Sequence, residues 1–282
     1  MSGPLSTGRR SLRSPRRPRV PTLYLPHGGG PCFFMEWTMG PPDTWNRMAS
    51  WLRSIESSLP GRPDKLLVVS GHWEATEPTV TSAKTPPLLF DYYGFPKSTY
   101  ELTWPAPGSP ELAARVRALL SEGGIASDAN AERGFDHGVF IPLKVAFPNA
   151  EYPTVQLSLK AGLDPHLHLA IGRALSPLRD EGVLIVGSGM SYHNMTSFMT
   201  PAAGSDSEAF DAWLVRSVAE APPARDHALE HWTDAPRARA CHPREEHLLP
   251  LMVVAGAGEA DPGRVVFRDV VMGSTVSAVR FG

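Results

Sequence analysis

The chain has 282 residues with a formal net charge of −2, and its 42% hydrophobic and 20% charged content is typical of a globular protein. The near-neutral charge gives no reason to expect nucleic acid or a membrane surface as a partner, and no apolar run approaches the roughly 20 residues of a membrane span. Two cysteines are too few for a disulfide-rich secreted scaffold, so we expect a reducing, cytoplasmic location.

The N-terminus differs from the rest of the chain. The stretch "RRSLRSPRRPR" concentrates arginine, serine and proline, and no acidic residue occurs before Glu36. Such a segment has too few apolar residues to pack, so we predict a disordered basic tail over residues 1–20 and one folded domain over residues 21–282. An organellar transit peptide is the alternative, although the prolines would interrupt the helix that such a peptide forms.

Strand-like and helix-like patterns alternate from residue 21 onward. Apolar runs bounded by small residues predict strands, and capped stretches with helical spacing predict helices. Strands are expected at 22–25, 65–71, 154–159 and 183–189, helices at 43–60, 109–124, 164–182, near 207–221 and near 243–255, and two closing strands joined at Gly273 within 263–282. This pattern predicts a single α/β domain with a central, mostly parallel or mixed sheet and helices on both faces. The loop-rich stretch 73–108 is expected to face a substrate.

Three histidines follow predicted buried strands. His27 comes after "TLYL", His72 after "LLVVSG" and His193 after "VLIVGSG". Ligands of open α/β sheets bind at the carboxyl ends of the strands. A single histidine there is usually a surface residue, but three at equivalent positions favour a metal or catalytic site.

Two further histidines are candidates. In "HPREEHLLPL", His247 is expected in the first turns of a helix, where an imidazole tends to stay neutral and free to coordinate a metal. His137 is expected in a loop beside Asp136, which could orient its tautomer or cap a turn. Structural or surface roles are expected for four other histidines, namely His166, His168, His227 and His231. The chain has no CxxC, P-loop or GxGxxG motif after its first strand.

Six ordered blocks resemble one family. They are "LPHGGGP", "SGHWE", "FDYYGFP" with "WPAPGSPELAARV", "GFDHGVFIPL", "GSGMSYHNM" and "EEHLLPLMVVAGA". Together they resemble the class III extradiol ring-cleavage dioxygenases, and within them the DOPA 4,5-dioxygenase-like branch, from about residue 21 to the end of the chain. The resemblance implies one α/β domain with a mononuclear non-haem metal at one edge of the sheet.

The resemblance also implies roles for five histidines. His27, His72 and His247 match metal ligands, while His193 matches a residue beside the metal that serves as acid and base or as a further ligand. His137 matches a histidine that contacts substrate or oxygen and assists catalysis. The implied reaction is Fe²⁺-dependent cleavage of a DOPA-like catechol by O₂ to a ring-opened semialdehyde. Zn²⁺ is the other metal that imidazoles could bind, and a monomer or small homo-oligomer is expected.

Two alternatives use the same fold. A zinc hydrolase would need a carboxylate that activates water, and Glu74 and Glu246 are the only candidates. A peptide-binding member of the superfamily would not need four convergent imidazoles. For packing an aromatic substrate ring, the candidates are Trp73, Tyr92, Tyr93 and Phe95, each of which could equally be a core residue.

Overall fold

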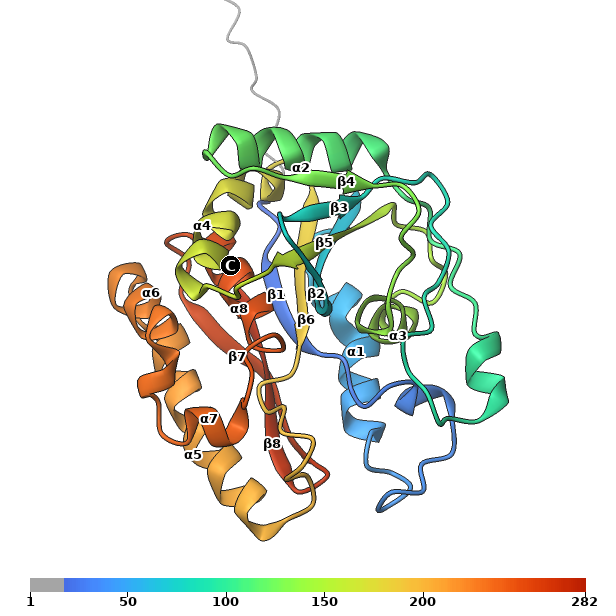
Figure 1. Cartoon of the computed structure of the whole chain (residues 1–282), viewed down its shortest axis with the longest axis vertical. Coiled ribbons are helices and arrows are strands. Elements are labelled where there is room, and N and C mark those ends of the chain that lie inside the picture. The colour runs from blue at the N-terminus through green and yellow to red at the C-terminus, as the bar shows by residue number, and fades with distance from the viewer. Residues whose placement is uncertain (1–17) are drawn as a thin grey trace, which may run out of the picture.

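A central mixed sheet organises the protein. The computed structural model describes residues 18–282, and within them eight strands lie in the order β4-β3-β5-β2-β6-β1-β8-β7 (Figure 1). The strands are β1 (Thr22–Pro26), β2 (Lys65–Ala75), β3 (Thr79–Thr81), β4 (Asp128–Asn130), β5 (Thr154–Lys160), β6 (Val183–Gly189), β7 (Gly263–Val271) and β8 (Ser274–Phe281). The predicted α/β domain with a mixed sheet is confirmed.

The middle of the sheet is parallel. Strands β5, β2, β6 and β1 run parallel to one another. At one margin β8 pairs antiparallel with β1 and β7 with β8, and at the other β3 pairs antiparallel with β5 and parallel with β4. The central strands are continuous apolar runs because helices cover both of their faces. Met272 and Gly273, with φ of 47° and 75°, form the turn between β7 and β8, so the predicted closing hairpin is confirmed.

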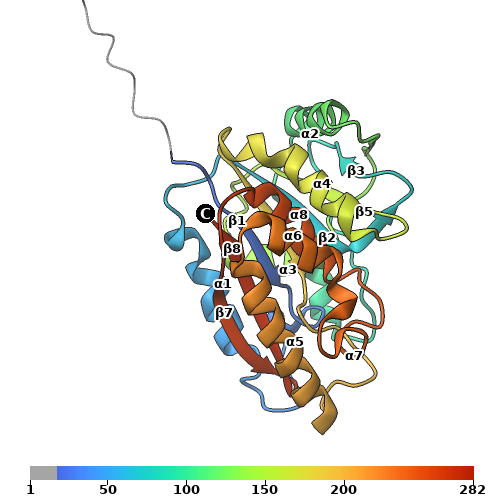
Figure 2. The ribbon, with the colours of Figure 1, turned by 90° about the vertical axis from the view of Figure 1, so that its left-hand side faces the viewer.

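Helices cover both faces of the sheet. The α-helices are α1 (Asn46–Ser58), α2 (Pro110–Glu122), α3 (His137–Ala146), α4 (Pro165–Leu175), α5 (Pro201–Ala219), α6 (Pro222–Glu230), α7 (Ala238–Cys241) and α8 (Leu249–Gly258), and short 3₁₀ turns are η1 (Cys32–Phe34), η2 (Lys97–Glu101), η3 (Ser176–Arg179) and η4 (Trp232–Asp234). Figure 2 shows α1 on one side of the sheet and α4, α5, α6 and α8 on the other. Every residue of α8 is buried, which explains its uniformly apolar sequence.

Close backbone contacts between α4 and α8 depend on glycine. A Cβ at Gly172 would lie 2.0 Å from the carbonyl oxygen of Val253, and one at Gly256 would lie 2.2 Å from that of Leu169. The two helices therefore pack backbone to backbone at these positions. This contact fixes α8 against the sheet and sets the position of the turn that precedes it.

Several helix boundaries differ from the sequence prediction. The helix expected near residue 243 begins at Leu249, and the one expected near residue 207 begins at Pro201, where the Thr200 hydroxyl accepts a hydrogen bond from the Ala203 amide at 3.2 Å. His137 was expected in a loop, but it is the first residue of α3. Nine of the ten α3 residues are buried, so the segment lacks the amphipathic period that reveals a surface helix.

Most of the predicted basic tail lies outside the described residues. Of its last residues, Arg19 forms ion pairs with Asp180 and Glu259, and Val20 is buried. Cys32 and Cys241 are both free and buried, and a cytoplasmic location stays a prediction. Over residues 18–282, no helix combines the length and apolar character needed to cross a membrane.

Candidate metal centre

Parallel strands bring the predicted histidines to one edge of the sheet. The ends of β1 and β6 pair at Pro26 and Gly189, so His27 and His193 leave the sheet on the same side. His72 was expected after a strand, but it lies within β2. The pairing of β2 with β5 shifts between Val69 and Glu74, and this irregularity contains His72. An irregular strand re-aims its side chains, as bulges near active sites do.

His247 reaches the same edge from a turn and not from a helix. Its backbone carbonyl accepts hydrogen bonds from the Met190 amide at 3.1 Å and the Tyr24 hydroxyl at 2.8 Å. A Cβ at Gly189 would lie 2.0 Å from this carbonyl oxygen. The glycine that ends "VLIVGSG" is therefore needed for the close approach of the His247 segment to the sheet.

Three imidazole nitrogens converge at the centre of the site. Nε2 of His72 lies 3.1 Å from Nε2 of His27 and 3.2 Å from Nε2 of His247, and the three ligand atoms all lie within 4.8 Å of one another. Nitrogens bound about 2.0–2.1 Å from one ion, at roughly 90–109° to each other, are separated by about 2.9–3.3 Å. The observed spacing thus fits three ligands of a single metal ion.

The outward-facing nitrogens have partners that fix the tautomers. Ser188 donates its hydroxyl proton to the Gly138 carbonyl, so its oxygen accepts from Nδ1 of His27 at 3.2 Å. Nδ1 of His247 lies 3.0 Å from the carboxylate of Glu246 and donates to it. Both arrangements leave Nε2 without a proton and facing the centre of the site, which is the form that binds a metal.

Burial keeps the three imidazoles neutral. It lowers the pKa of His27 and of His247 well below the usual value, and the neighbouring imidazoles lower both further. Burial likewise lowers the pKa of His72 to about 3, with an added contribution from His137 that Asp91 partly offsets. Metal ligation by histidine requires the neutral form, so these side chains fit a resident metal ion.

His193 and His137 flank the three converging imidazoles. His193 stacks on His247 with ring centroids 3.4 Å apart, and its Nδ1 lies 3.3 Å from the same Glu246 oxygen that His247 contacts. His137 lies on the other side, with its ring centroid 3.9 Å from that of His72. All five histidines of the sequence prediction are therefore brought together.

Asp91 orients His137, a role that sequence reasoning left to Asp136. One Asp91 oxygen accepts from Nδ1 of His137 at 2.8 Å and from its backbone amide at 2.9 Å. Burial raises the pKa of Asp91, but the hydrogen bonds from His137 outweigh it and the pKa is lowered. Asp136 is the N-cap residue of α3, but its side chain is bonded to Ser70 and Gln156 and makes no capping hydrogen bond. The available signal for Asp91 was its place in the block "FDYYGFP".

A cavity of about 410 Å³ opens over the histidines. Three of the predicted aromatic residues, Tyr92, Tyr93 and Phe95, line it, together with Gly28, Gly29 and Gly30. Trp73 does not line it, because its ring packs under the guanidinium of Arg133 at 4.5 Å. The sequence analysis missed other apolar lining residues, namely Trp37, Met39, Trp45, Met190, Met195, Phe198 and Met272.

The other polar candidates have structural partners. Glu74 forms a bidentate ion pair with Arg244, in which both N–O distances are 2.6 Å. His168 is buried and bonded to the Asp164 carbonyl, while His166 contacts Glu230. His227 on α6 and His231 just after it contact each other with tilted rings, whose centroids are 4.3 Å apart. None of these four histidines lines the cavity, consistent with the roles predicted for them.

Comparison with known proteins identifies the class. The family model described as the catalytic LigB subunit of aromatic ring-opening dioxygenase matches residues 21–281, and the chain belongs to this family. It falls in the class III extradiol, DOPA dioxygenase-like branch, as its relatives show. A 4,5-DOPA dioxygenase extradiol of Beta vulgaris is 38% identical over 213 residues, covering 74% of this chain and 78% of the relative.

A bacterial relative and a solved structure extend the match to nearly the whole chain. A 4,5-DOPA dioxygenase extradiol of Escherichia coli K12 is 34% identical over 260 residues, covering 91% of this chain and 92% of the relative. The crystal structure of an uncharacterized Escherichia coli K12 protein superposes with a TM-score of 0.75 at 31% identity, covering 94% of this chain and 100% of that one. The predicted family and fold are both confirmed.

Proposed function

We propose that this protein is a non-haem Fe(II)-dependent extradiol dioxygenase that cleaves the ring of a catechol with O₂. Both oxygen atoms of O₂ enter the product, which is a ring-opened semialdehyde carrying a new carboxylate. The observation that carries this proposal is the convergence of three neutral Nε2 atoms beneath an aromatic-lined cavity. The 4,5-DOPA dioxygenase names of the relatives support the same chemistry.

His27, His72 and His247 would hold the metal. Bound Fe(II) supplies open coordination positions and passes electron density from the catechol to O₂, which do not react readily with each other in their ground states. The chain's own contribution is to keep the three imidazoles neutral and correctly oriented. Gly28, Gly29 and Gly30 add only backbone to the cavity wall, which leaves room above the histidines.

His193 is the proton-transfer group in this proposal, and His137 assists it. Both line the cavity, and both have an Nδ1 held by a carboxylate. Nδ1 of His193 donates to Glu246, so its Nε2 is free to accept a catechol proton and later return it. Histidine suits both steps because its unperturbed pKa of about 6.5 lies near neutral pH. His137, fixed by Asp91, would position the substrate or oxygen.

The zinc hydrolase alternative is less well supported. Its two candidate carboxylates are already engaged, Glu74 with Arg244 and Glu246 with two imidazoles. Zinc binding to the same three histidines stays compatible with their geometry. The peptide-binding alternative does not explain why five histidines cluster at one site, because peptide binding does not require them.

Anaerobic loading with Fe(II), followed by addition of 4-methylcatechol and L-DOPA in air, tests the proposal. We expect oxygen uptake together with the visible absorbance of a semialdehyde. His72→Ala should lose both the bound iron and the product, whereas His166→Ala, at an exposed histidine outside the cavity, should keep both. Absence of oxygen uptake with every catechol, in protein that binds zinc tightly, would overturn the proposal in favour of a hydrolase.

A further inference from the structure

Apart from imidazoles, tyrosine hydroxyls and indole N–H groups, the cavity above the histidines offers no side-chain partner for a charged substrate substituent. Among the described residues that line it, none is lysine, arginine, aspartate or glutamate. Away from the histidines, its wall is built from aromatic rings and the thioethers of Met39, Met190, Met195 and Met272. Apart from the imidazoles and backbone amides, the wall therefore offers mainly apolar and polarizable contacts.

Each arginine next to the cavity is already paired. Arg133 lies 3.3 Å from Asp136, and Arg244 forms its two contacts with Glu74. Arg47 forms an ion pair with Asp269. The positive charge of each of these guanidiniums is thus already balanced by a nearby carboxylate. Two further carboxylates, Asp91 and Glu246, lie directly behind the site histidines and add negative charge there.

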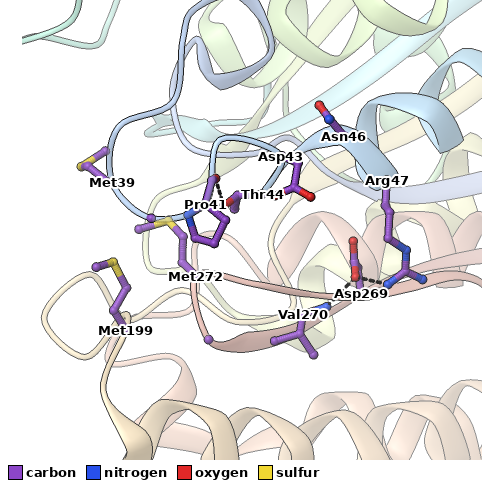
Figure 3. A pocket seen from close by; sticks show the side chains of 12 residues that line it. Met39, Pro41, Asp43, Thr44, Asn46, Arg47, Met199, Asp269, Val270 and Met272 are labelled. Carbon is purple, nitrogen blue, oxygen red and sulfur yellow. Dashed lines mark hydrogen bonds and ion pairs between the residues drawn. The ribbon is translucent and has the colours of Figure 1, made fainter.

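An outer groove begins at the cavity with methionine side chains, and polar residues, among them Asp43, Asn46 and Arg47, line its far part. This groove of about 510 Å³ shares Met39 and Met272 with the cavity, so the two spaces meet at these side chains. Figure 3 shows Met39, Met272 and Met199 gathered at one end of the groove, and the Arg47–Asp269 ion pair at the other. Met39 and Met199 are 46% and 57% exposed, so their thioethers are open to a ligand that leaves the cavity.

We propose that the natural substrate is a catechol with a neutral, apolar ring substituent that runs along Met39 and Met272 into the outer groove. This inference deepens the proposed function and rests on it. A carboxylate or zwitterion in the cavity would lose its hydration without gaining an ionic partner, which disfavours its binding. An alkyl or aryl substituent would instead gain from burial, and the gain grows with each CH₂ group. The structure thus favours a lipophilic catechol over an amino-acid catechol such as DOPA.

Anaerobic calorimetric titration of the Fe(II)-loaded protein measures this preference without turnover. The matched ligands are 4-propylcatechol and 3-(3,4-dihydroxyphenyl)propanoate, which have chains of similar length and differ in charge, with L-DOPA as a third ligand. We expect 4-propylcatechol to bind at least about tenfold more tightly than the propanoate. Affinity should also rise from 4-methylcatechol through 4-propylcatechol to 4-heptylcatechol as the chain reaches the groove.

A charge introduced at the junction of the two spaces tests where the substituent lies. Met39→Lys should strengthen binding of the propanoate about threefold or more and weaken binding of 4-heptylcatechol. Val215→Lys is the matched control, because it adds the same charge at an exposed apolar position on α5 that lines neither space. It should leave the ratio of the two affinities unchanged.

The outcomes separate this inference from the proposed function. Equal or tighter binding of the propanoate or L-DOPA by the unmodified protein would overturn the inference, whatever the rate of ring cleavage. An affinity that does not change from 4-methylcatechol to 4-heptylcatechol would overturn the role of the groove. If the binding preference is found but no catechol consumes oxygen, the proposed reaction fails while the assignment of the pocket stands.

Discussion

The hydroxyl oxygen of Ser188 lies 3.2 Å from Nδ1 of His27 and accepts its proton, because the serine's own proton goes to the Gly138 carbonyl. This buried contact fixes which imidazole nitrogen faces the site. Ser188→Ala should therefore weaken iron binding, and loss of such a partner typically costs about 10–100-fold in metal affinity. Competition against a chelator of known affinity, with the metal-free protein, measures the effect.

A buried serine elsewhere in the sheet controls for lost stability. Ser158 on β5 accepts a hydrogen bond from the Thr79 amide at 2.9 Å and contacts no imidazole. Ser158→Ala should lower the melting temperature without changing iron affinity relative to the unmodified protein. Equal iron affinity in Ser188→Ala and in the unmodified protein would show that the Ser188 hydroxyl does not orient His27.

Ring stacking with His247 places His193 beside the three converging imidazoles and outside their group of Nε2 atoms. We therefore expect His193→Ala to retain one iron per chain and to lose about 10²–10⁴-fold in kcat, the usual contribution of a general acid or base. Iron analysis and oxygen-uptake rates with 4-methylcatechol measure the two effects separately. Loss of iron together with activity would instead make His193 a fourth ligand.

The sequence pattern predicted which strand ends carry histidines, but not how the strands are ordered. Buried apolar runs and glycine or serine at their ends indicated His27 and His193 correctly, because parallel strands expose their carboxyl ends at one edge. His247 lies 220 residues after His27, and no local period reveals that its carbonyl meets Tyr24 and Met190. The expected helix start made His247 a candidate ligand, and the resemblance to a family matched it to the same ligand set as His27 and His72.

Local signals also failed where tertiary contacts decide the conformation. His137 begins a helix that is buried on nearly every side, so no amphipathic stripe marked it. Asp91 contacts His137 from 46 residues away, whereas the neighbouring Asp136 was the natural candidate in sequence. Trp73 shared the aromatic signal of Tyr92 but faces Arg133. These differences arise from long-range packing, which residue spacing does not encode.

Gly138 lies where a side chain would press on His72, one of the three converging imidazoles. A Cβ there would be 2.4 Å from Oγ of Ser70 and 2.9 Å from Cδ2 of His72. Alanine normally stabilises a helix by about 0.5–1 kcal/mol relative to glycine, but overpacking a buried site costs about 1–3 kcal/mol. Gly138→Ala should therefore lower both the free energy of unfolding and the affinity for iron.

Gly61 provides the matched comparison for this substitution. A Cβ at Gly61 would have no atom within 4 Å, so Gly61→Ala should leave iron affinity unchanged and shift the melting temperature little. Denaturant unfolding and chelator competition, measured on both variants, separate the clash from the general effect of adding a methyl group. A Gly138→Ala variant as stable as the unmodified protein, with unchanged iron affinity, would contradict the predicted clash.

Buried histidines should make the metal-free protein sensitive to acid. Burial lowers the pKa of His242 to about 3, with smaller contributions from its neighbours, and it also lowers the pKa values of His27, His72 and His247. In the unfolded chain each imidazole has a pKa of about 6.5 and takes up a proton that the folded protein excludes. The contribution of each such histidine to the free energy of unfolding is therefore fully present above about pH 6.5. As the pH falls toward 3, this contribution decreases by about 1.4 kcal/mol per pH unit.

His242→Phe isolates one of these contributions outside the three converging imidazoles. Nε2 of His242 donates to the Ser191 carbonyl at 3.0 Å, and its Nδ1 has no hydrogen-bond partner. The variant loses that hydrogen bond at every pH but also loses one proton-binding site of the unfolded chain. Its free energy of unfolding, measured in urea between pH 7.5 and pH 5, should fall less steeply with acid than that of the unmodified protein. The same series on His166→Phe, at an exposed side chain, shows what replacing a surface histidine does to the slope. An unchanged slope in His242→Phe would mean that His242 is protonated in the folded protein.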